Sequence, residues 1–199
     1  MCQLVETIKC KNGKICNIAY HNTRFNNSRR ELFGIHEIID LSDFIFIPEH
    51  ANSGTFKCRV LYKKEIGSIE FTAYQPRNIS SLKIVFDPEI HYPFKYTDRN
   101  QLELLYEKRG ECDDIVIVKN GFITDSYMAN LIFWDGKKWY TPATPLLQGI
   151  QRAKLLKEGK IFQCPVKLED LSAFKKVGLI NAFQDLEEMP EIPTSQIRT

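Results

Sequence analysis

Residues 121–134 have the sequence Gly-Phe-Ile-Thr-Asp-Ser-Tyr-Met-Ala-Asn-Leu-Ile-Phe-Trp, in which two short apolar segments flank the carboxylate of Asp125. The segments Phe122–Thr124 and Asn130–Trp134 are rich in β-branched and aromatic residues, which favour strands. A carboxylate between two such strands is either a turn former or a buried functional acid, and on this stretch alone the turn former is favoured. The chemical role of Asp125 therefore depends on what the rest of the chain provides.

Apolar periodicity on either side of this stretch predicts further strands and helices. The other predicted strands are Gln3–Lys9, Lys14–Ile18, Thr55–Tyr62, Ser68–Tyr74, Leu82–Phe86, Ile115–Val118, Lys138–Tyr140, Ile161–Val166 and Val177–Ala182. The predicted helices are Tyr20–Phe33, Gln101–Lys108, Ile150–Lys157 and Leu168–Phe174, with a short one after Ser42-Asp43. Asn12-Gly13 predicts a hairpin turn, Gly34 a helix end, and the acidic, proline-broken tail after Asp185 irregular structure.

The segment Asp87–Phe94 contains two prolines and is the best candidate for a linker between lobes. It separates an N-terminal lobe, residues 1–88, from a C-terminal lobe, residues 95–199, with residues 89–94 between them. The first lobe is expected to hold an antiparallel sheet, which includes Leu82–Phe86, and one or two helices. The predicted fold class is α+β in two lobes.

Composition excludes several classes of protein. Hydrophobic residues make up 43% of the 199 residues and charged ones 26%, an ordinary globular balance. The net charge of +2, from 27 basic and 25 acidic residues, argues against nucleic acid as a partner. No apolar stretch is long enough for a membrane span and the N-terminus lacks signal-peptide features, so we expect a cytoplasmic protein without membrane contact. None of the six cysteines forms a C-x-x-C pair, which predicts reduced thiols and no metal.

Two further segments have the residue types of a binding or catalytic site. Lys95 lies between Phe94 and Tyr96, and a partly desolvated lysine has a lowered pKa that suits imine chemistry. On spacing alone, a lysine that extends past its neighbours to water is the favoured interpretation. Gly149 precedes a predicted helix, whose first N–H groups can hold a phosphate, although a glycine in this place is common.

In this order and spacing, the segments resemble the class IV aminotransferase-like family, the pyridoxal phosphate (PLP) enzymes of fold type IV. The resemblance runs from about Leu4 to Ala182. The matching segments are Val5–Lys9 with Asn12-Gly13, His21–Arg24 as an H-x-x-R helix, Lys95 with Arg99, residues 122–133, Tyr140–Pro142, and Gly149–Arg152 as a G-I-x-R element. A chance match to all of them in order is improbable.

The resemblance implies a fold like that of D-amino-acid aminotransferase, with a small N-terminal α/β sandwich and a larger C-terminal β-barrel-like lobe. It also implies a homodimer that acts on a small-molecule substrate. The family's opening strand matches near the first residues of this chain, so the chain is expected to lack the N-terminal hairpin that usual members carry.

The resemblance assigns the site residues by role. Lys95 would form the Schiff base with pyridoxal 5'-phosphate and then act as the acid–base group, and Asp125, in place of the family's Glu, would contact the ring nitrogen. Thr7, on the opening strand, would face the substrate and assist proton transfer. The implied phosphate contacts are Arg24, the backbone N–H groups of Ile150 and Gln151, and the turn at Asn181 and Ala182.

Within the family, the sequence favours aminodeoxychorismate lyase, which converts 4-amino-4-deoxychorismate into 4-aminobenzoate, a folate precursor, and pyruvate. Lys95 with Arg99, Asn130–Trp134 and Asn181-Ala182 resemble the lyase's patterns. An amino-acid transaminase acting on branched-chain or D-amino acids is the alternative, for which no dedicated arginine for an α-carboxylate is evident. An inactive remnant of the PLP fold is a further alternative, and the presence of Lys95 argues against it.

Overall fold

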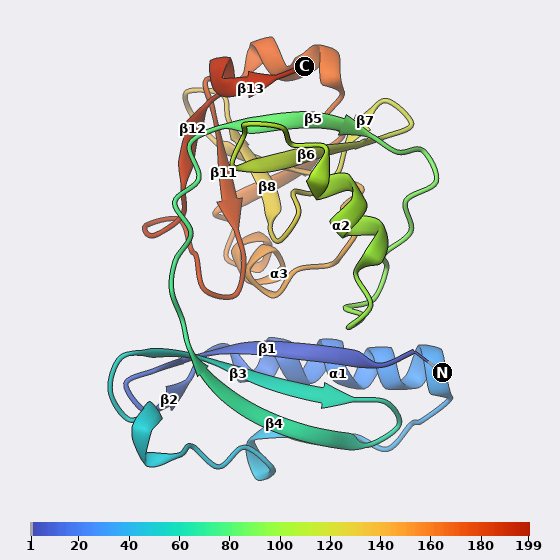
Figure 1. The fold of residues 1–199 in the computed structure, drawn as a ribbon, viewed down its shortest axis with the longest axis vertical. Coiled ribbons are helices and arrows are strands. Elements are labelled where there is room, and N and C mark those ends of the chain that lie inside the picture. The colour runs from blue at the N-terminus through green and yellow to red at the C-terminus, as the bar shows by residue number, and fades with distance from the viewer. Residues whose placement is uncertain (1) are drawn as a thin grey trace. The chain divides into compact units, whose positions relative to one another are not determined.

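The computed structural model describes residues 2–199 and divides into two compact units (Figure 1). The first unit contains residues 2–76 and 94–98, and the second contains residues 77–93 and 99–199. Both units combine strands with helices, so the predicted α+β class in two lobes is confirmed. Within the described chain, no helix has the length and apolar character to cross a membrane.

The first unit is an antiparallel sheet in the order β2-β1-β3-β4 with one long helix. This helix lies along one face of the sheet (Figure 1). The core of the unit includes Leu4 and Ile8 of the sheet and Phe25 of the helix. The elements are β1 (Leu4–Lys11), β2 (Lys14–Ile15), α1 (Ile18–Phe33), β3 (Thr55–Tyr62) and β4 (Ile66–Ala73), with 3-10 turns η1 (Leu41–Asp43) and η2 (Glu49–Ala51).

Local sequence explains the β1–β2 hairpin and the ends of α1. Asn12 and Gly13 both have positive φ, 50° and 71°, as the predicted two-residue hairpin turn requires. The second strand ends at Ile15, earlier than predicted, because Asn17 adopts a left-handed conformation with φ 55° and the helix starts directly after it. Gly34, with φ 68°, ends the helix as predicted.

The second unit contains two sheets, one in the order β10-β9-β8-β11-β12 and one in the order β13-β5-β6-β7. Side chains from both sheets, among them Leu82, Val116 and Phe133, share one core. The elements are β5 (Leu82–Phe86), α2 (Asn100–Glu107), β6 (Asp114–Lys119), β7 (Phe122–Ile123), β8 (Asn130–Trp134), β9 (Trp139–Pro142), α3 (Ile150–Lys157), β10 (Ile161–Cys164), η3 (Leu168–Ala173), β11 (Lys176–Ile180), β12 (Glu191–Pro193), η4 (Thr194–Gln196) and β13 (Ile197–Arg198).

Two pairs of strands that are neighbours in the chain are parallel, and each pair is connected by a helix. Strands β5 and β6 are joined through α2, and β9 and β10 through α3. A parallel pair needs such a crossover because the chain must return to the end of the sheet at which the first strand began. In the second crossover, the loop 143–149 connects the end of β9 to the start of α3.

The boundary between the units differs from the predicted one at residue 88. Leu82–Phe86 was expected in the first lobe, but β5 pairs in parallel with β6 and lies in the second unit. Conversely, Lys95 lies in the first unit, because its carbonyl accepts a hydrogen bond of 2.9 Å from the N–H of Val5. Pairing between distant segments decides both placements, and local periodicity contains no information on it.

The sequence predicted irregular structure after Asp185, and this prediction is wrong, because the tail contributes two strands. Strand β12 pairs antiparallel with β11, and β13 pairs parallel with β5. Ile192 is wholly buried in the core, and this burial holds β12 in place despite the neighbouring prolines. Pro193 is tolerated because β12 is the edge strand of its sheet. A smaller correction concerns the predicted helix at Leu168–Phe174, which is the 3-10 helix η3.

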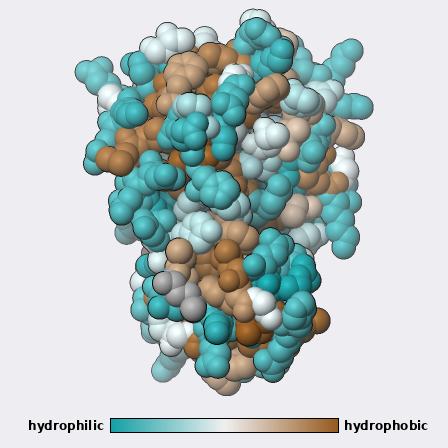
Figure 2. All heavy atoms as spheres, turned by 90° about the vertical axis from the view of Figure 1, so that its right-hand side faces the viewer, coloured by the Kyte–Doolittle hydropathy of each residue, from teal (hydrophilic) through white to brown (hydrophobic). Residues whose placement is uncertain are grey.

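The face of the molecule drawn in Figure 2 is mainly hydrophilic, with apolar side chains between the polar ones. The large apolar side chains that are exposed are Leu32, Ile38, Phe44, Phe46, Phe86, Leu104, Met128 and Phe162. Scattered apolar exposure of this kind is ordinary in folded proteins, so it assigns no binding surface by itself.

The buried tail strand can be tested by the substitution Ile192→Ala. Removal of a wholly buried isoleucine side chain should lower the free energy of unfolding by about 2–5 kcal/mol. The control Ile38→Ala, at a side chain 82% exposed, should change it by about 0.5 kcal/mol or less. Urea unfolding followed by circular dichroism measures both, and equal effects would contradict the buried strand.

Candidate active site

Glu6 is a wholly buried carboxylate in the first unit. Alternate residues of a strand point to the same face, and on β1 the residues Leu4, Ile8 and Cys10, which share this register with Glu6, are all wholly buried. A carboxylate in an apolar row is unfavourable unless it is paired and hydrogen-bonded. Glu6 must therefore find its partners inside the protein.

The partners of Glu6 come from α1. Arg24 donates from Nε to Oε1 at 2.8 Å and from Nη2 to Oε2 at 2.6 Å, a two-point pair between guanidinium and carboxylate. Nδ1 of His21 lies 2.6 Å from Oε2. His21 and Arg24 are three residues apart and therefore share one face of the helix. Burial raises the pKa of Glu6, but the charge of Arg24 and the hydrogen bonds from both side chains lower it overall to about 2.

His21 is the second side chain of α1 that contacts Glu6. Burial lowers its pKa, against the opposing effect of Glu6, so the ring is neutral and its proton lies on Nδ1, facing the carboxylate. Nε2 is buried and has no hydrogen-bond partner among residues 2–199. The positive charges of Arg24 and Lys95 also lower the pKa of His21. Arg24 and Lys95, both predicted cofactor residues, therefore lie in the same part of the first unit.

Lys95 lies on a short segment that runs beside the start of β1. Besides the bond from Val5 to Lys95, Thr97 donates from its N–H to the carbonyl of Gln3 at 2.9 Å, and Tyr96 forms a bridge with Leu4. The rings on either side of Lys95 pack against the core of the first unit, and the lysine itself is half-buried. Backbone pairing thus anchors the lysine to the strand that carries Glu6.

Thr7 is not brought together with this cluster. It is half-buried on β1, opposite Arg59 of β3. Because side chains alternate along a strand, Thr7 points to the face opposite Glu6 and α1. Glu6 itself was not singled out by the sequence patterns, although an acidic residue in an apolar alternation was a signal that would have found it.

Asp125, in the second unit, is also buried and is bonded to the loop before α3. Its Oδ1 accepts a hydrogen bond of 2.7 Å from Nδ2 of Asn130, and its Oδ2 accepts one of 3.0 Å from the N–H of Leu147. Burial, only partly offset by these bonds and by the charge of Arg152, raises its pKa to about 6. The side chain of Asp125 is therefore a buried acid bonded to Asn130 and Leu147, and its functional role stays a prediction.

The start of α3 leaves no room for a side chain at Gly149. A Cβ there would lie 1.9 Å from Oδ1 of Asn130, whose Nδ2 also donates to the carbonyl of Leu147 at 2.9 Å. Gln151, in the first turn, is buried, and its Nε2 has no hydrogen-bond partner in the described chain. Arg152 is buried as well and bonds to Thr141 and other groups around β9, which makes it a structural residue.

Asn181 and Ala182 form a tight turn at the end of β11. The backbones of Asn181 and Gln184 exchange two hydrogen bonds of 3.1 and 3.2 Å, and Oδ1 of Asn181 accepts one of 2.9 Å from the N–H of Phe183. The side chain of Asn181 therefore shapes the turn, and a ligand contact here would fall to the backbone. Such a contact remains a prediction.

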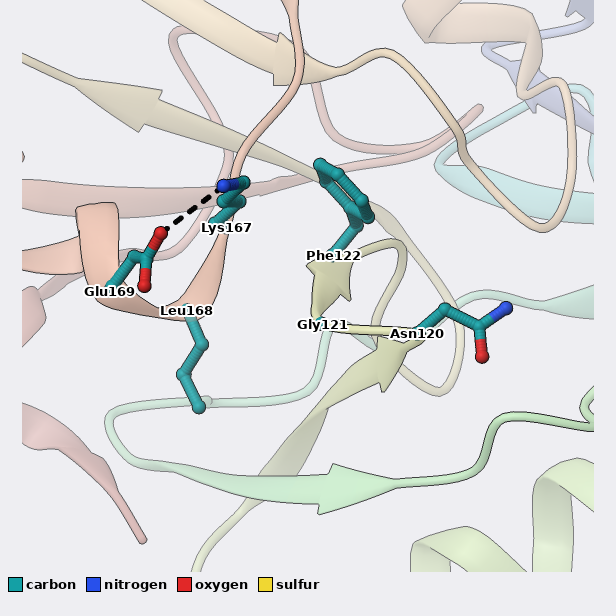
Figure 3. Close-up of a pocket in the computed structure, with 6 residues that line it drawn as sticks. All are labelled: Asn120, Gly121, Phe122, Lys167, Leu168 and Glu169. Carbon is teal, nitrogen blue, oxygen red and sulfur yellow. Dashed lines mark hydrogen bonds and ion pairs between the residues drawn. The ribbon is translucent and has the colours of Figure 1, made fainter.

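A surface pocket of about 460 Å³ in the second unit contains none of the predicted site residues. It lies at the β6–β7 turn and the start of η3, where Lys167 and Glu169 form an ion pair of 3.3 Å (Figure 3). Its lining residues are Asn120, Gly121, Phe122, Lys167, Leu168 and Glu169.

The residues of both units fit the chemistry of pyridoxal phosphate. Asp125 is a buried acid whose ionised form is disfavoured, and a protonated ring nitrogen would compensate it. The unpartnered amide of Gln151 and the helix start at Gly149 suit a phosphate. In the first unit, Lys95 provides an amine for an aldehyde and Arg24 a guanidinium for a phosphate.

Comparison with known proteins assigns this chain to one enzyme family. The model of the amino-transferase class IV family matches residues 85–188. An uncharacterised protein of Haemophilus influenzae is 42% identical over 188 residues, 94% of this chain and 100% of the relative.

Solved structures agree with this family match. The crystal structure of a candidate 4-amino-4-deoxychorismate lyase of Haemophilus somnus has a TM-score of 0.86 and 34% identity, covering 94% of this chain and 98% of the other. A hypothetical aminotransferase of Mycobacterium tuberculosis in its PLP-bound form has a TM-score of 0.76 at 15% identity, covering 99% and 84%, and shares the fold.

The close approach at the start of α3 predicts a specific effect of Gly149→Ala. The added Cβ displaces the Asn130 side chain and its bonds to Asp125 and Leu147, which should cost about 1–3 kcal/mol of unfolding free energy. In an Asn130→Ala background the clash is absent, so the same substitution should cost much less. Thermal and urea unfolding of the four proteins measure this, and additive effects would contradict the clash.

The pKa of Asp125 predicts that its contribution to stability falls as pH rises. In the folded chain the pKa is about 6, against an ordinary value of 3.8. Between these values the folded state binds the extra proton, so the contribution of Asp125 to the free energy of unfolding decreases from pH 4 to pH 6, by about 3 kcal/mol at most. Urea unfolding of the protein without PLP at several pH values measures the slope of stability with pH. Asp125→Asn should shift that slope upward in this range, because the falling contribution is lost, while the exposed control Asp43→Asn leaves it as it is. An unchanged slope in Asp125→Asn would contradict the assignment.

Proposed function

The chain belongs to the class IV aminotransferase family, which uses pyridoxal 5'-phosphate as cofactor, and we propose that it is an aminodeoxychorismate lyase. The reaction is the release of pyruvate from 4-amino-4-deoxychorismate, which leaves 4-aminobenzoate. The observation that carries the proposal is the likeness, over almost the full length of both chains, to the candidate lyase of Haemophilus somnus. The proposal includes a cytoplasmic homodimer and a role of the product in folate synthesis.

Sequence features within the matched region support the lyase over a transaminase. Lys95 is followed after four residues by Arg99, and Asn130–Trp134 and Asn181-Ala182 resemble the lyase's segments. The guanidinium of Arg99 donates to the carbonyl of Tyr127 at 2.6 Å and lies over the ring of the same residue. Arg99 is thus engaged by the protein, which leaves it poorly placed to select the α-carboxylate of an amino acid.

In the proposed mechanism, PLP supplies the electron sink when it is bound. Lys95 would hold the cofactor through its amine and, as a free amine, would take the proton from the amine-bearing carbon of the substrate. The bond between the ring carbon and the ether oxygen would break as the ring becomes aromatic, and the proton would return to the departing enol, which becomes pyruvate. Asp125 keeps the ring nitrogen protonated. Arg24 and the N–H groups of Ile150 and Gln151 bind the phosphate.

Two further assignments complete the proposed site. The turn at Asn181 and Ala182 contributes backbone contacts to the phosphate. Thr7 assists proton transfer from the face of β1 opposite Glu6. Both follow from the family's arrangement, and substitution of Thr7 by valine, with PLP affinity as a second measurement, distinguishes a role in turnover from one in cofactor binding.

The test is pyruvate release from enzymatically prepared 4-amino-4-deoxychorismate with no keto acid present. The expected result is turnover that Lys95→Ala lowers by about a thousandfold or more, because the acid–base group is lost. Lys63→Ala, at an exposed lysine of the same unit, is the matched control and should retain turnover. Borohydride should also attach the cofactor to a peptide that contains Lys95.

Other outcomes select the alternatives. Turnover of alanine, leucine or D-alanine that requires a keto acid would identify a transaminase of branched-chain or D-amino acids instead. Protein that takes up no PLP and stays colourless with added cofactor would identify an inactive remnant of the fold.

A further inference from the structure

We propose that Glu6 is a positioning residue that fixes the guanidinium of Arg24 for the cofactor phosphate, with His21 as its support. The inference rests on the proposed use of Arg24 as a phosphate ligand and adds a residue that the family resemblance did not assign. It is carried by the two-point pair between Arg24 and a wholly buried carboxylate.

The first step concerns the geometry of the guanidinium. Glu6 binds the edge of Arg24 that carries Nε and Nη2, so the edge that carries Nη1 is directed away from the carboxylate. Two simultaneous hydrogen bonds fix the plane of the guanidinium as well as its position. The side chain of Arg24 retains 14% of its surface, whereas that of Glu6 is fully buried. One edge is thus anchored in the interior while the group still reaches the surface of the unit.

The second step concerns the support of Glu6. His21, one turn before Arg24 on α1, lies 2.6 Å from the same Oε2 that receives Nη2. The neutral ring donates from Nδ1 and adds no positive charge that would compete with Arg24 for the carboxylate. Because β1 supplies Glu6 and α1 supplies both donors, the cluster also joins helix to sheet. A rigid backbone on both sides keeps the guanidinium in one orientation.

The third step separates orientation from charge. A carboxylate near a phosphate site repels the anion, so its removal should by simple electrostatics strengthen phosphate binding. If Glu6 instead acts by holding Arg24 in place, its removal should weaken binding, because a mobile arginine loses conformational freedom when the ligand binds. The two effects have opposite signs, and the affinity of a Glu6→Gln variant therefore distinguishes them.

The experiment measures the dissociation constant of PLP for the full-length protein freed of cofactor, by quenching of tryptophan fluorescence, with inorganic phosphate as competitor. Glu6→Gln should weaken PLP binding by about tenfold or more. In an Arg24→Ala background the same substitution should change affinity by about twofold or less, because there is no guanidinium left to orient. His21→Ala, which leaves Glu6 and Arg24 in place, should weaken PLP binding in the same direction and by a smaller factor.

Two control variants separate positioning from loss of fold. Ile8→Val removes a methyl group from the same buried row of β1, and Glu70→Gln removes an exposed carboxylate from β4. Both should bind PLP as the unmodified protein does. If Glu6→Gln does not fold, the His21→Ala comparison decides.

The outcomes distinguish this inference from the proposed function. Unchanged or tighter PLP binding in Glu6→Gln, or equal loss in the presence and absence of Arg24, would overturn the positioning role while leaving the proposed function intact. Absence of PLP binding by the unmodified protein would instead overturn the proposed function.

Discussion

The first unit depends on one ion cluster, in which the buried carboxylate of Glu6 is held by two side chains of α1. The free energy cost of an ionised group without water is high, and in this protein the two-point pair with Arg24 and the bond from His21 offset it. The pKa of about 2 means that the carboxylate stays ionised across the physiological range. Removal of Arg24 would leave a buried carboxylate without an opposite charge, and removal of His21 would take away one of its hydrogen bonds. Sheet and helix are therefore joined by electrostatics as well as by apolar packing.

Asp125, a buried carboxylate of the second unit, is stabilised differently from Glu6. Asp125 receives hydrogen bonds from an amide side chain and a backbone N–H but forms no close ion pair among the described residues, and its pKa rises to about 6. Neutral donors stabilise a carboxylate less than a guanidinium does. The two acids therefore differ in what they offer a ligand. Glu6 is satisfied within the protein, whereas the ionised form of Asp125 would gain from a cation that the ligand brings.

The sequence predicted correctly those features that depend only on residues close together in the chain. The bounds of β3, β5, β8 and α3 agree with the predicted segments, and the Asn12-Gly13 turn has the backbone that its residues require. The pairing of β5 with β6, the attachment of Lys95 to β1 and the strands of the tail all depend on distant partners, which periodicity does not encode. The same holds for the site. The resemblance assigned Arg24, but the residue that holds Arg24 became visible only when β1 and α1 were placed together.

The contacts of Asn130 link Asp125 to the start of α3, the two parts of the second unit that the proposed site uses. Its Nδ2 donates to Asp125 and to the carbonyl of Leu147, while its Oδ1 occupies the space that a side chain at position 149 would need. One amide therefore sets the place of the acid relative to the first turn of α3. Because β8 carries Asn130 and the β9–β10 crossover carries α3, the spacing between the acid and the helix start is fixed by the sheet itself. A ligand with a ring nitrogen and a phosphate at a constant separation requires that kind of rigidity.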